Sequence, residues 1–394
     1  MGKPLVVNSY SAGWLKKGFS WVYLKEVRSG GGRPGSRREV RDERGALLGT
    51  AVCDEGWLAA RLMRHGPGPL DQAWLCGVLD RARALRERVV DSETTGFRLV
   101  NAENDGLPGV RVDWWDHVAV IALDSPSLVG LLDGLCDWLT ETMSPRGIVL
   151  CYRKDHRDSR DWNAVEPKPG LLRGRVPPGP VRVRERGLNF EILPDDGPDV
   201  GLYADMREVR AWLEPHWGGT SVLNTFAYTG AFSVSAAFNG AIEVVTVDLS
   251  NKVLERAKQN FRANELDPEL YDFDGMDTFK ALDRYRRTGR RFDRVVLDPP
   301  SFSHSDVGVW SAKRDYPRLV ASAARVLSAG GWLIAASNQG EVSPKAFSGF
   351  VADGVRKAGR SARLLWWGGQ APDFPASIAH PEGRYLKVAI YELD

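Results

Sequence analysis

The chain has 394 residues, more than one hydrophobic core usually organises, so we expect two or three domains. Hydrophobic residues make up 43% and charged residues 26%, close to a globular average, and no apolar run is long enough to cross a membrane. No signal-peptide pattern opens the chain, so a cytoplasmic protein is expected. The four cysteines, Cys53, Cys76, Cys136 and Cys151, lie at scattered spacings that indicate neither a disulfide framework nor a metal site.

A net charge of +2 neither favours nor excludes a polyanionic partner, because the distribution of charge decides phosphate binding. Here the distribution is uneven. Basic side chains crowd three stretches: Arg28, Arg33, Arg37, Arg38, Arg41 and Arg44; Arg81, Arg83, Arg86 and Arg88; and Arg284, Arg286, Arg287, Arg290 and Arg291. Each stretch is either a phosphate-contacting surface or a solvated one, and the sequence leaves both interpretations open.

Residues 1 to about 70 contain short β-like runs separated by glycine-rich turns, which predicts a small β-rich domain. The runs are Trp21–Leu24, Glu39–Asp42 and Leu47–Val52. Aromatic residues gather in the same region: Trp14, Phe19, Trp21 and Tyr23. At such spacing aromatic side chains usually fill a core, and stacking on bases is the alternative.

A middle α/β unit is expected between residue 71 and about Arg153. Apolar residues recur at helical spacing over Gln72–Val90, and Phe97–Val112 followed by Val118–Leu123 has the pattern of strand, turn and strand. From Asp158 to Pro180 the chain is rich in proline, glycine and charge, which is the composition of a linker.

From Val181 onward strands and helices alternate, which predicts a mostly parallel, doubly wound sheet covered on both faces. The expected strands are Ser221–Asn224, Glu243–Asp248, Glu269–Phe273, Arg294–Leu297, Trp332–Ala336 and Leu386–Tyr391. The expected helices are Ala231–Phe238, Lys252–Asn264, Pro317–Leu327 and Pro344–Ala358.

In such a sheet ligands bind at the carboxyl ends of the strands, near the switch in strand order. The first strand-to-helix turn is Asn224–Gly230, and Gly230 allows close backbone approach before a helix. The turn lacks the Gly-x-Gly-x-x-Gly pattern of dinucleotide sites, so a nicotinamide cofactor is disfavoured. Asp248 ends the second strand, where a carboxylate can accept hydrogen bonds from a ribose diol. Together these features favour a cofactor that carries a nucleoside.

The fourth strand ends in Asp298-Pro299-Pro300-Ser301-Phe302, the most informative stretch of the chain. Two consecutive prolines hold the backbone extended, and Asp298 adds a hydrogen-bond acceptor beside their carbonyl groups. Such a rim suits the edge of a planar, amino-bearing ring. The alternative is a rigid strand-ending turn with a capping aspartate.

Taken together, these motifs are similar to those of the PUA-fused bacterial methyltransferases that act on large-subunit (23S) ribosomal RNA. The matching segments, in order, are Glu103–Gly109, Gly201–Arg207, Asn224–Gly230, Val247-Asp248, Asp298–Phe302 and His380–Lys387. The resemblance implies a PUA-like RNA-binding domain at 1–70, a middle α/β domain with linker at 71–175, and a class I, Rossmann-like methyltransferase domain at 176–394. It also implies S-adenosyl-L-methionine as cofactor and RNA as partner.

The resemblance further implies which residues bind the cofactor. They are Tyr203, Asp205, Arg207, Asn224, Phe226, Tyr228, Thr229, Gly230, Asp248, Leu249, Asp277 and Asp298. Asp277 would accept from the adenine amine. From helix propensity alone, a capping role is an equal alternative for Asp277.

Methylation at carbon 5 of a pyrimidine requires a cysteine thiolate that attacks carbon 6. Family members of that type carry a cysteine after the fifth strand, where this chain has Asn338, and no cysteine follows Cys151. A ring nitrogen already owns a lone pair, so methyl transfer to it needs alignment and desolvation only. We therefore favour nitrogen methylation, at guanine N7, because the Asp-Pro-Pro-Ser-Phe-Ser and Ser-Asn stretches are also similar to the guanine-N7 half of a bifunctional 23S enzyme.

On this interpretation Asp298 and Asn338 orient the base, Pro299 and Pro300 form the rim, and Phe302 stacks on a flipped base or fills the core. Three alternatives stay open: 5-methylcytosine formation, a catalytically silent RNA-binding protein, and methylation of a protein or small molecule. The sequence leaves the oligomeric state open, with a homodimer as one candidate.

Overall fold

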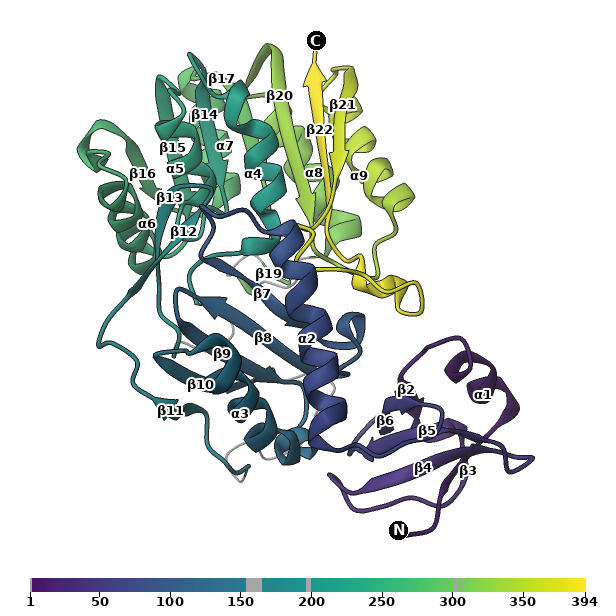
Figure 1. Ribbon diagram of the computed structural model, residues 1–394. Coiled ribbons are helices and arrows are strands. Elements are labelled where there is room, and N and C mark those ends of the chain that lie inside the picture. Colours follow the sequence, from purple (N-terminus) through teal and green to yellow (C-terminus); the bar gives the residue numbers. More distant parts are fainter. Residues whose placement is uncertain (1, 154–164, 196–199, 301–303, 306–307, 310) are drawn as a thin grey trace. The chain divides into compact units, whose positions relative to one another are not determined.

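The computed structural model describes all residues except 1, 154–164, 196–199, 301–303, 306–307 and 310 (Figure 1). The described chain divides into two compact units. Unit 1 comprises Met1–Val183, Ile192–Val200 and Pro372–Gly383, and unit 2 comprises Arg184–Glu191, Gly201–Ala371 and Arg384–Asp394. No helix in these described ranges is long and apolar enough to span a membrane.

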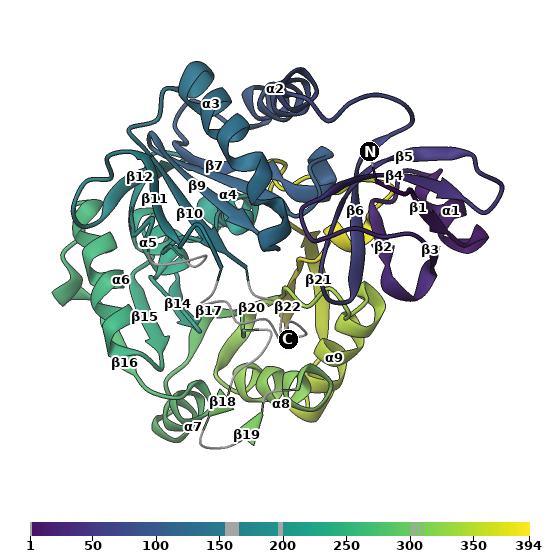
Figure 2. The same ribbon diagram turned by 90° about the horizontal axis from the view of Figure 1, so that it is seen from below.

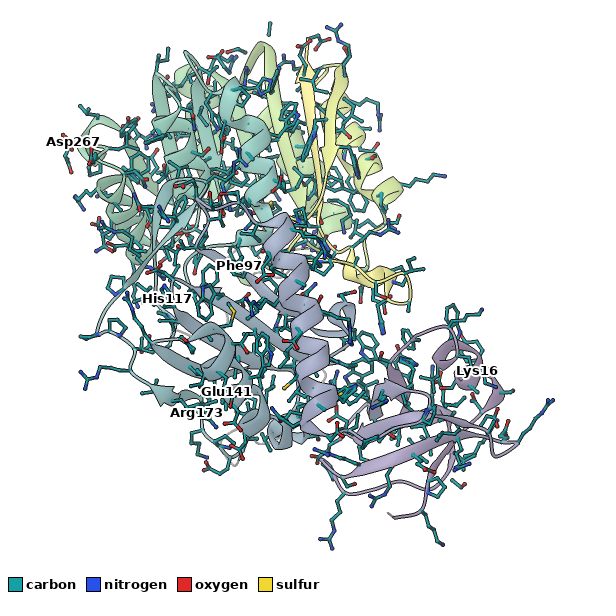
Figure 3. The ribbon with its side chains drawn as sticks, in the orientation of Figure 1. Lys16, Phe97, His117, Glu141, Arg173 and Asp267 are labelled. Atoms are coloured by element: carbon teal, nitrogen blue, oxygen red, sulfur yellow. The ribbon has the colours of Figure 1, made fainter. Side chains whose placement is uncertain are left out.

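The N-terminal part of unit 1 is a six-stranded sheet in the order β2-β6-β5-β4-β1-β3, with one helix. Its elements are β1 Leu5–Val7, α1 Ser9–Leu15, β2 Trp21–Tyr23, β3 Val27–Ser29, β4 Arg37–Asp42, β5 Leu47–Cys53 and β6 Leu58–His65. Small aliphatic side chains such as Val40 and Leu62 form its core. Lys16, which follows α1, donates to Asp42 at 2.9 Å and holds the helix to the sheet (Figure 3).

The aromatic residues of this domain are packed against one another and are not all interior. Trp14 is 47% exposed and lies edge-to-face against Phe19, whose ring in turn meets Trp21. Core filling therefore accounts for part of the cluster. The base-stacking alternative stays open for the exposed Trp14.

The rest of unit 1 is a five-stranded sheet in the order β11-β10-β9-β8-β7, with two helices. The elements are α2 Gln72–Val89, β7 Gly96–Asn101, β8 Val110–Trp115, β9 Val118–Leu123, α3 Leu132–Met143, β10 Gly147–Tyr152 and β11 Gly170–Gly174. The expectation of a linker over Asp158–Pro180 was wrong for β11, which pairs antiparallel with β10. Arg173 of β11 also pairs with Asp137 of α3 at 2.7 Å (Figure 3).

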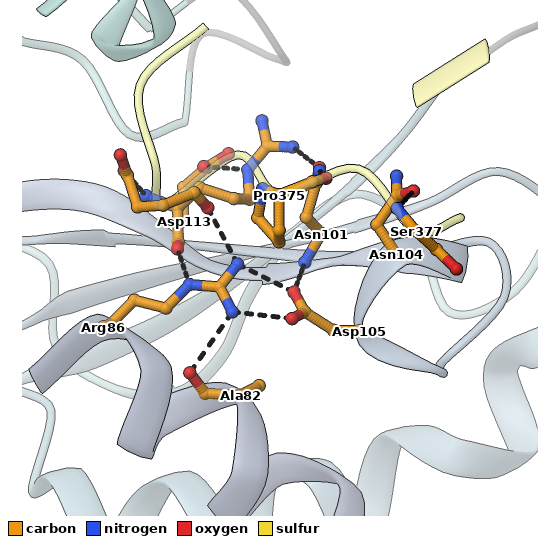
Figure 4. Close-up of polar contacts among 10 residues, drawn as sticks. Ala82, Arg86, Asn101, Asn104, Asp105, Asp113, Pro375 and Ser377 are labelled. Carbon is orange, nitrogen blue, oxygen red and sulfur yellow. Dashed lines mark hydrogen bonds and ion pairs between the residues drawn. The ribbon is translucent and has the colours of Figure 1, made fainter. Parts of the chain in front are cut away.

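A buried ion pair fastens α2 to the sheet. Both terminal nitrogens of Arg86 donate to the two carboxylate oxygens of Asp105 at 2.7 Å, and Arg86 Nε donates to the carbonyl oxygen of Arg98 (Figure 4). A further bond joins Arg86 to the carbonyl oxygen of Asp373 at 2.8 Å. Both partners of the pair are buried, so each needs the other to offset its lost hydration. Of the basic stretch 81–88, Arg86 is thus a core residue.

Replacing Arg86 with methionine should therefore destabilise the protein by about 3–5 kcal/mol, because it leaves the Asp105 carboxylate buried without its partner. Urea unfolding of the full chain measures this loss. Arg83→Met on the same helix is the matched control, since the exposed Arg83–Glu87 pair should contribute less than about 0.5 kcal/mol. Equal effects of the two substitutions would contradict the assignment.

Unit 2 is built on a seven-stranded sheet in the order β16-β15-β14-β17-β20-β22-β21 (Figures 1 and 2). Its strands are β14 Ser221–Thr225, β15 Glu243–Asp248, β16 Asp272–Gly275, β17 Phe292–Leu297, β20 Leu327–Ser337, β21 Ala362–Gly368 and β22 Lys387–Leu393. Its helices are α4 Arg207–Leu213, α5 Ala231–Phe238, α6 Asn251–Ala263, α7 Thr278–Thr288, α8 Ala312–Ala324 and α9 Pro344–Lys357. The short strands β12 Val181–Glu185 and β13 Leu188–Ile192 form a separate two-stranded sheet, and β18 His304–Ser305 pairs with β19 Gly308–Val309.

The central strands of this sheet are parallel and buried on both faces, as expected from their continuous apolar runs. The expected strand Glu243–Asp248 and helix Ala231–Phe238 match β15 and α5 residue for residue. Other elements differ in their bounds. The expected strand Glu269–Phe273 was wrong, because Pro268–Leu270 forms a 3-10 turn and the strand begins at Asp272.

Two further expectations need correction. The helix expected from Pro317 begins at Ala312, so that Pro317 lies inside α8. The edge strand β21 was not expected, because its sequence alternates poorly and much of it faces solvent. The division of the chain into domains at 1–70, 71–175 and 176–394 remains a prediction.

Candidate active site

The strand order of unit 2 reverses beside β14, whose neighbours are β15 on one side and β17 on the other. The chain leaves β14 into α5, β15 into α6 and β17 into the Asp298-Pro299-Pro300 stretch. All three exits lie at one edge of the sheet because the strands are parallel. This edge is the position at which doubly wound sheets bind their ligands.

The turn after β14 is held in an unusual conformation. Phe226 and Tyr228 have φ values of 54° and 49°, and Gly230 has φ 78°. Left-handed backbone costs on the order of 1 kcal/mol or more at a residue with a side chain, so such a turn marks a functional candidate. At Gly230 a Cβ atom would stand 3.0 Å from the Cβ of Ala257 on α6, so only glycine fits without displacement.

The side chains of two predicted cofactor residues in this turn make hydrogen bonds within the protein. Asn224 is buried, and its side-chain amide donates to Ser233 Oγ at 2.9 Å. Thr229 is buried too, and its hydroxyl donates to the carbonyl oxygen of Gly201. The prediction that either side chain contacts the cofactor stays a prediction, and their observed contacts indicate support of the turn.

Asp248 lies beside the turn at the end of β15. Its Oδ2 accepts from the backbone N–H of Tyr228 at 2.9 Å, and its Oδ1 accepts from the N–H of Ser250 at 3.0 Å. Each carboxylate oxygen can accept a second hydrogen bond, so the side chain keeps capacity for a diol. The next residue, Leu249, is 67% exposed.

Asp277 caps α7, as the propensity argument allowed. Its Oδ1 accepts from the N–H of Lys280 at 3.1 Å. Within the described part of the chain, its Oδ2 makes no hydrogen bond. The cap and a role as acceptor for the adenine amine are therefore compatible, and the second role stays a prediction.

The segment before α4 carries Tyr203, Asp205 and Arg207. The Tyr203 ring lies 5.1 Å from the ring of Tyr228, and the Asp205 Oδ2 accepts from the hydroxyl of Tyr385 at 2.6 Å. Arg207 is buried at the start of α4. The structure thus brings Tyr203 to the turn after β14.

Arg210 holds this segment and was not among the predicted site residues. Its guanidinium forms a bidentate pair with Glu185 at 2.6 and 2.7 Å, and it donates to the Tyr203 carbonyl oxygen at 2.9 Å. Both charged side chains are only 3% exposed. The only sequence signal for Arg210 was its spacing of three from Arg207 on one helix. Its partner Glu185 lies 25 residues away, so the ion pair could not be predicted from local sequence.

Asp298 is partly buried at the end of β17, and its surroundings oppose ionisation. Burial and the neighbouring carboxylate of Asp205 raise its pKa to about 7, while Arg210 acts in the opposite direction. Near neutral pH this carboxyl can therefore donate or accept a hydrogen bond. A carboxyl whose pKa is strongly raised by burial and a like charge is a candidate for a functional site.

The remaining predicted residues, as far as they are described, follow strands that end at the same edge of the sheet. Pro299 is buried and Pro300 is exposed, directly after Asp298. Asn338 follows β20 and is exposed. Phe302 falls outside the described residues.

S-Adenosylmethionine fits this set of groups. The cofactor presents a ribose diol, an adenine amine and a sulfonium cation, and the edge presents the carboxyl groups of Asp248, Asp277 and Asp298. No group of three or more His, Cys, Asp or Glu side chains that could hold a metal occurs among the described residues.

A family profile for S-adenosylmethionine-dependent methyltransferases matches residues 146–378. The chain belongs to this family. The methyltransferase is 34% identical over 385 residues to ribosomal RNA large subunit methyltransferase I of Pseudoalteromonas translucida. The aligned region covers 95% of each chain. The same-named protein of Alteromonas mediterranea is 33% identical over 384 residues and covers 96% of each chain.

Solved structures show the same fold. A methyltransferase complexed with SAH superposes on this methyltransferase with a TM-score of 0.88 at 24% identity, covering 99% of both chains. An S-adenosylmethionine-dependent methyltransferase from Streptococcus mutans gives a TM-score of 0.85 over the same share. The predicted family, class I fold, enzymatic activity and cofactor are confirmed. The PUA-like assignment of the N-terminal domain stays a prediction.

The raised pKa of Asp298 makes the stability of the methyltransferase depend on pH. The folded pKa of about 7 exceeds the ordinary 3.8, so the stability that this carboxyl contributes is complete below about pH 4 and is lost as the pH rises through 7. Urea unfolding without cofactor should show Asp298→Asn gaining about 2 kcal/mol relative to wild type between pH 5 and pH 8. If the free energies of unfolding of the two proteins changed in parallel with pH, the raised pKa of Asp298 would be contradicted.

Asp248→Ala should weaken cofactor binding by about 1–3 kcal/mol, because it removes a charge-assisted acceptor from the ribose diol. Calorimetric titration of the methyltransferase with S-adenosylmethionine measures the change. Glu255→Ala is the control, since this side chain is exposed on the neighbouring helix and, among the described residues, pairs only with Lys258. Unchanged affinity in a folded Asp248→Ala variant would remove Asp248 from the site.

Proposed function

We propose that this methyltransferase modifies a base of large-subunit ribosomal RNA, and that the acceptor atom is a ring nitrogen, guanine N7. The RNA substrate is supported by the relatives named ribosomal RNA large subunit methyltransferase I, which match nearly the whole chain. The nitrogen acceptor rests on one observation: unit 2, whose sheet edge carries the candidate site, contains no cysteine that could act as a thiolate nucleophile.

The position after β20 is occupied by Asn338, and the four cysteines all belong to unit 1. Two of them are also poor nucleophiles. Burial raises the pKa of the Cys151 thiol to about 12 and raises the pKa of Cys136 as well. Covalent attack on carbon 6 of a pyrimidine is therefore disfavoured because unit 2 has no cysteine, and for Cys136 and Cys151 also because their thiols resist ionisation.

The chemistry left to the protein is alignment and desolvation. The cofactor supplies the methyl group on its sulfonium when bound. Asp298 and Asn338 follow the adjacent strands β17 and β20 and would hold the polar edge of the base, with Pro299 and Pro300 forming a rigid wall. An N7 acceptor needs no proton removed, so a partly protonated Asp298 would serve as a hydrogen-bond partner and not as a base.

The structure narrows the basic surfaces that could meet RNA phosphates. Arg286 and Arg287 pair with Asp283, which neutralises much of the charge on α7. In the N-terminal domain Arg41 pairs with Glu39. Three exposed arginines of that domain have a guanidinium without an acidic partner among the described residues: Arg33, Arg37, which donates to the carbonyl oxygen of Leu70, and Arg44. We assign phosphate contacts to these three.

A variant with Cys53, Cys76, Cys136 and Cys151 all replaced by serine or alanine should keep methyl transfer, because a ring-nitrogen acceptor needs no thiolate. Transfer from labelled S-adenosylmethionine to ribosomal RNA of a strain lacking the enzyme measures the activity. Nucleoside mass spectrometry of the wild-type product should find 7-methylguanosine.

Circular dichroism and thermal unfolding are the control for folding, because three of the cysteines are buried. A folded variant without any transfer would contradict nitrogen methylation, as would a covalent adduct of the wild type with RNA containing 5-fluorocytosine. A 5-methylcytosine product would support the pyrimidine alternative. Absence of any product, with cofactor bound, would support a silent RNA-binding protein.

A further inference from the structure

Lys387 is a buried cation to which the proposed reaction assigns no role. It lies at the edge of the unit 2 sheet where β17 and β20 end. It begins β22 and is 4% exposed. Its Nζ donates to the carbonyl oxygen of Gln339 at 2.5 Å, and within the described part of the chain this is its only hydrogen bond. No carboxylate in the described part of the chain pairs with Lys387. A lysine ammonium has three N–H donors, so two are left for another acceptor.

A buried ammonium without an ion-pair partner is costly, since burial removes its hydration. The consequence is visible in its protonation, because burial lowers the pKa of Lys387 to about 8. Such a group is uncommon in a protein interior unless a ligand completes its environment.

The topology places Lys387 beside the predicted base-binding residues. β22 runs antiparallel to β20, and Lys387 lies opposite Ser337, the last residue of β20. The amino end of β22 therefore meets the same edge as the carboxyl ends of β17 and β20. Neighbouring strands are about 4.8 Å apart, so Lys387 stands one strand beyond Asn338 and two beyond Asp298.

An ammonium donor at this edge of the sheet suits one edge of guanine. Guanine presents two acceptors side by side, N7 and O6, whereas adenine presents N7 beside an amino donor. Methylation consumes the N7 lone pair and leaves O6 as an acceptor. A lysine can donate to O6 but cannot accept from the amino group of adenine.

We propose that Lys387 recognises the exocyclic carbonyl oxygen O6 of the target guanine and so selects guanine over adenine. This inference rests on the proposed function. Lys387 would be a specificity-determining residue, with the carbonyl oxygen of Gln339 orienting its ammonium. The same bond ties Lys387 to the turn that carries Asn338.

The test is a cycle of two changes, one in the protein and one in the base. Once nucleoside mapping has located the methylated residue, the substrate is a ribosomal RNA fragment with guanosine or with 2-aminopurine riboside at that position. The analogue keeps N7 and lacks O6. The full-length proteins are the wild type, Lys387→Met, Lys387→Arg and the control Lys357→Met, which changes an exposed lysine on α9.

We expect Lys387→Met to lower kcat/KM on the guanosine RNA by about 10- to 100-fold, which is the discrimination that a good base contact gives. The wild type should lose a similar factor on the 2-aminopurine RNA, and Lys387→Met should lose nothing further there. Lys387→Arg should recover part of the guanosine activity without recovering activity on the analogue. Lys357→Met should behave as the wild type.

Equal losses by Lys387→Met on both RNAs, or reduced cofactor affinity, would overturn the proposal and leave Lys387 as a support for the Gln339 turn. A loss of RNA affinity with a shallower salt dependence would also overturn it, because that result indicates a phosphate contact. The product of the wild type is identified first. A product other than 7-methylguanosine would overturn the proposed function itself, independently of the variants.

Discussion

The candidate site of unit 2 depends on one buried ion pair, Arg210 with Glu185. The arginine is used three times: it neutralises Glu185, it holds the Tyr203 carbonyl oxygen, and its charge favours the ionised form of Asp298. A buried guanidinium can serve several acceptors because its donors form a rigid planar fork. The same side chain therefore holds the segment before α4 and acts on the ionisation of Asp298.

Asp298 stands between two opposing influences. Burial and Asp205 disfavour its charge, and Arg210 favours it, so that the pKa lies close to neutrality. Asp205 is in turn held by the hydroxyl of Tyr385. A change at either end of this chain of contacts would alter the ionisation of Asp298 without touching it. Residues outside the expected motif thus control the chemistry of the motif.

The sequence predicted what depends on short-range pattern. β15 and α5 were expected residue for residue because their apolar runs are bounded by polar turn residues. β21 was missed because an edge strand with exposed Leu364 and Trp367 lacks the burial that produces such a pattern. α8 was expected to start at Pro317, since proline usually opens a helix, whereas five helical residues precede it.

The candidate site was recognised from local motifs for the same reason, and its residue roles remain predictions. Gly230 and Asp298 stand out as local motifs, and the structure places them at one edge of the sheet. The supporting residues Glu185, Arg210 and Lys387 act through partners that are 25 and 48 residues away in the sequence. Pairings at such separations leave no signal in a single sequence. Asn224 shows the opposite case. It lies inside the predicted cofactor motif, but its side chain donates to Ser233.

The position of β22 has a consequence for how the enzyme is made. It follows every other strand of its sheet in the chain, yet it lies between β20 and β21. During synthesis β20 and β21 emerge before β22, the strand that pairs with both. Lys387 at the start of β22 therefore also emerges after Gln339, to which it donates. Such non-local pairing forms slowly. This edge of the sheet is therefore assembled last, and a nascent chain already able to fold β14 and β15 would still lack part of the candidate site.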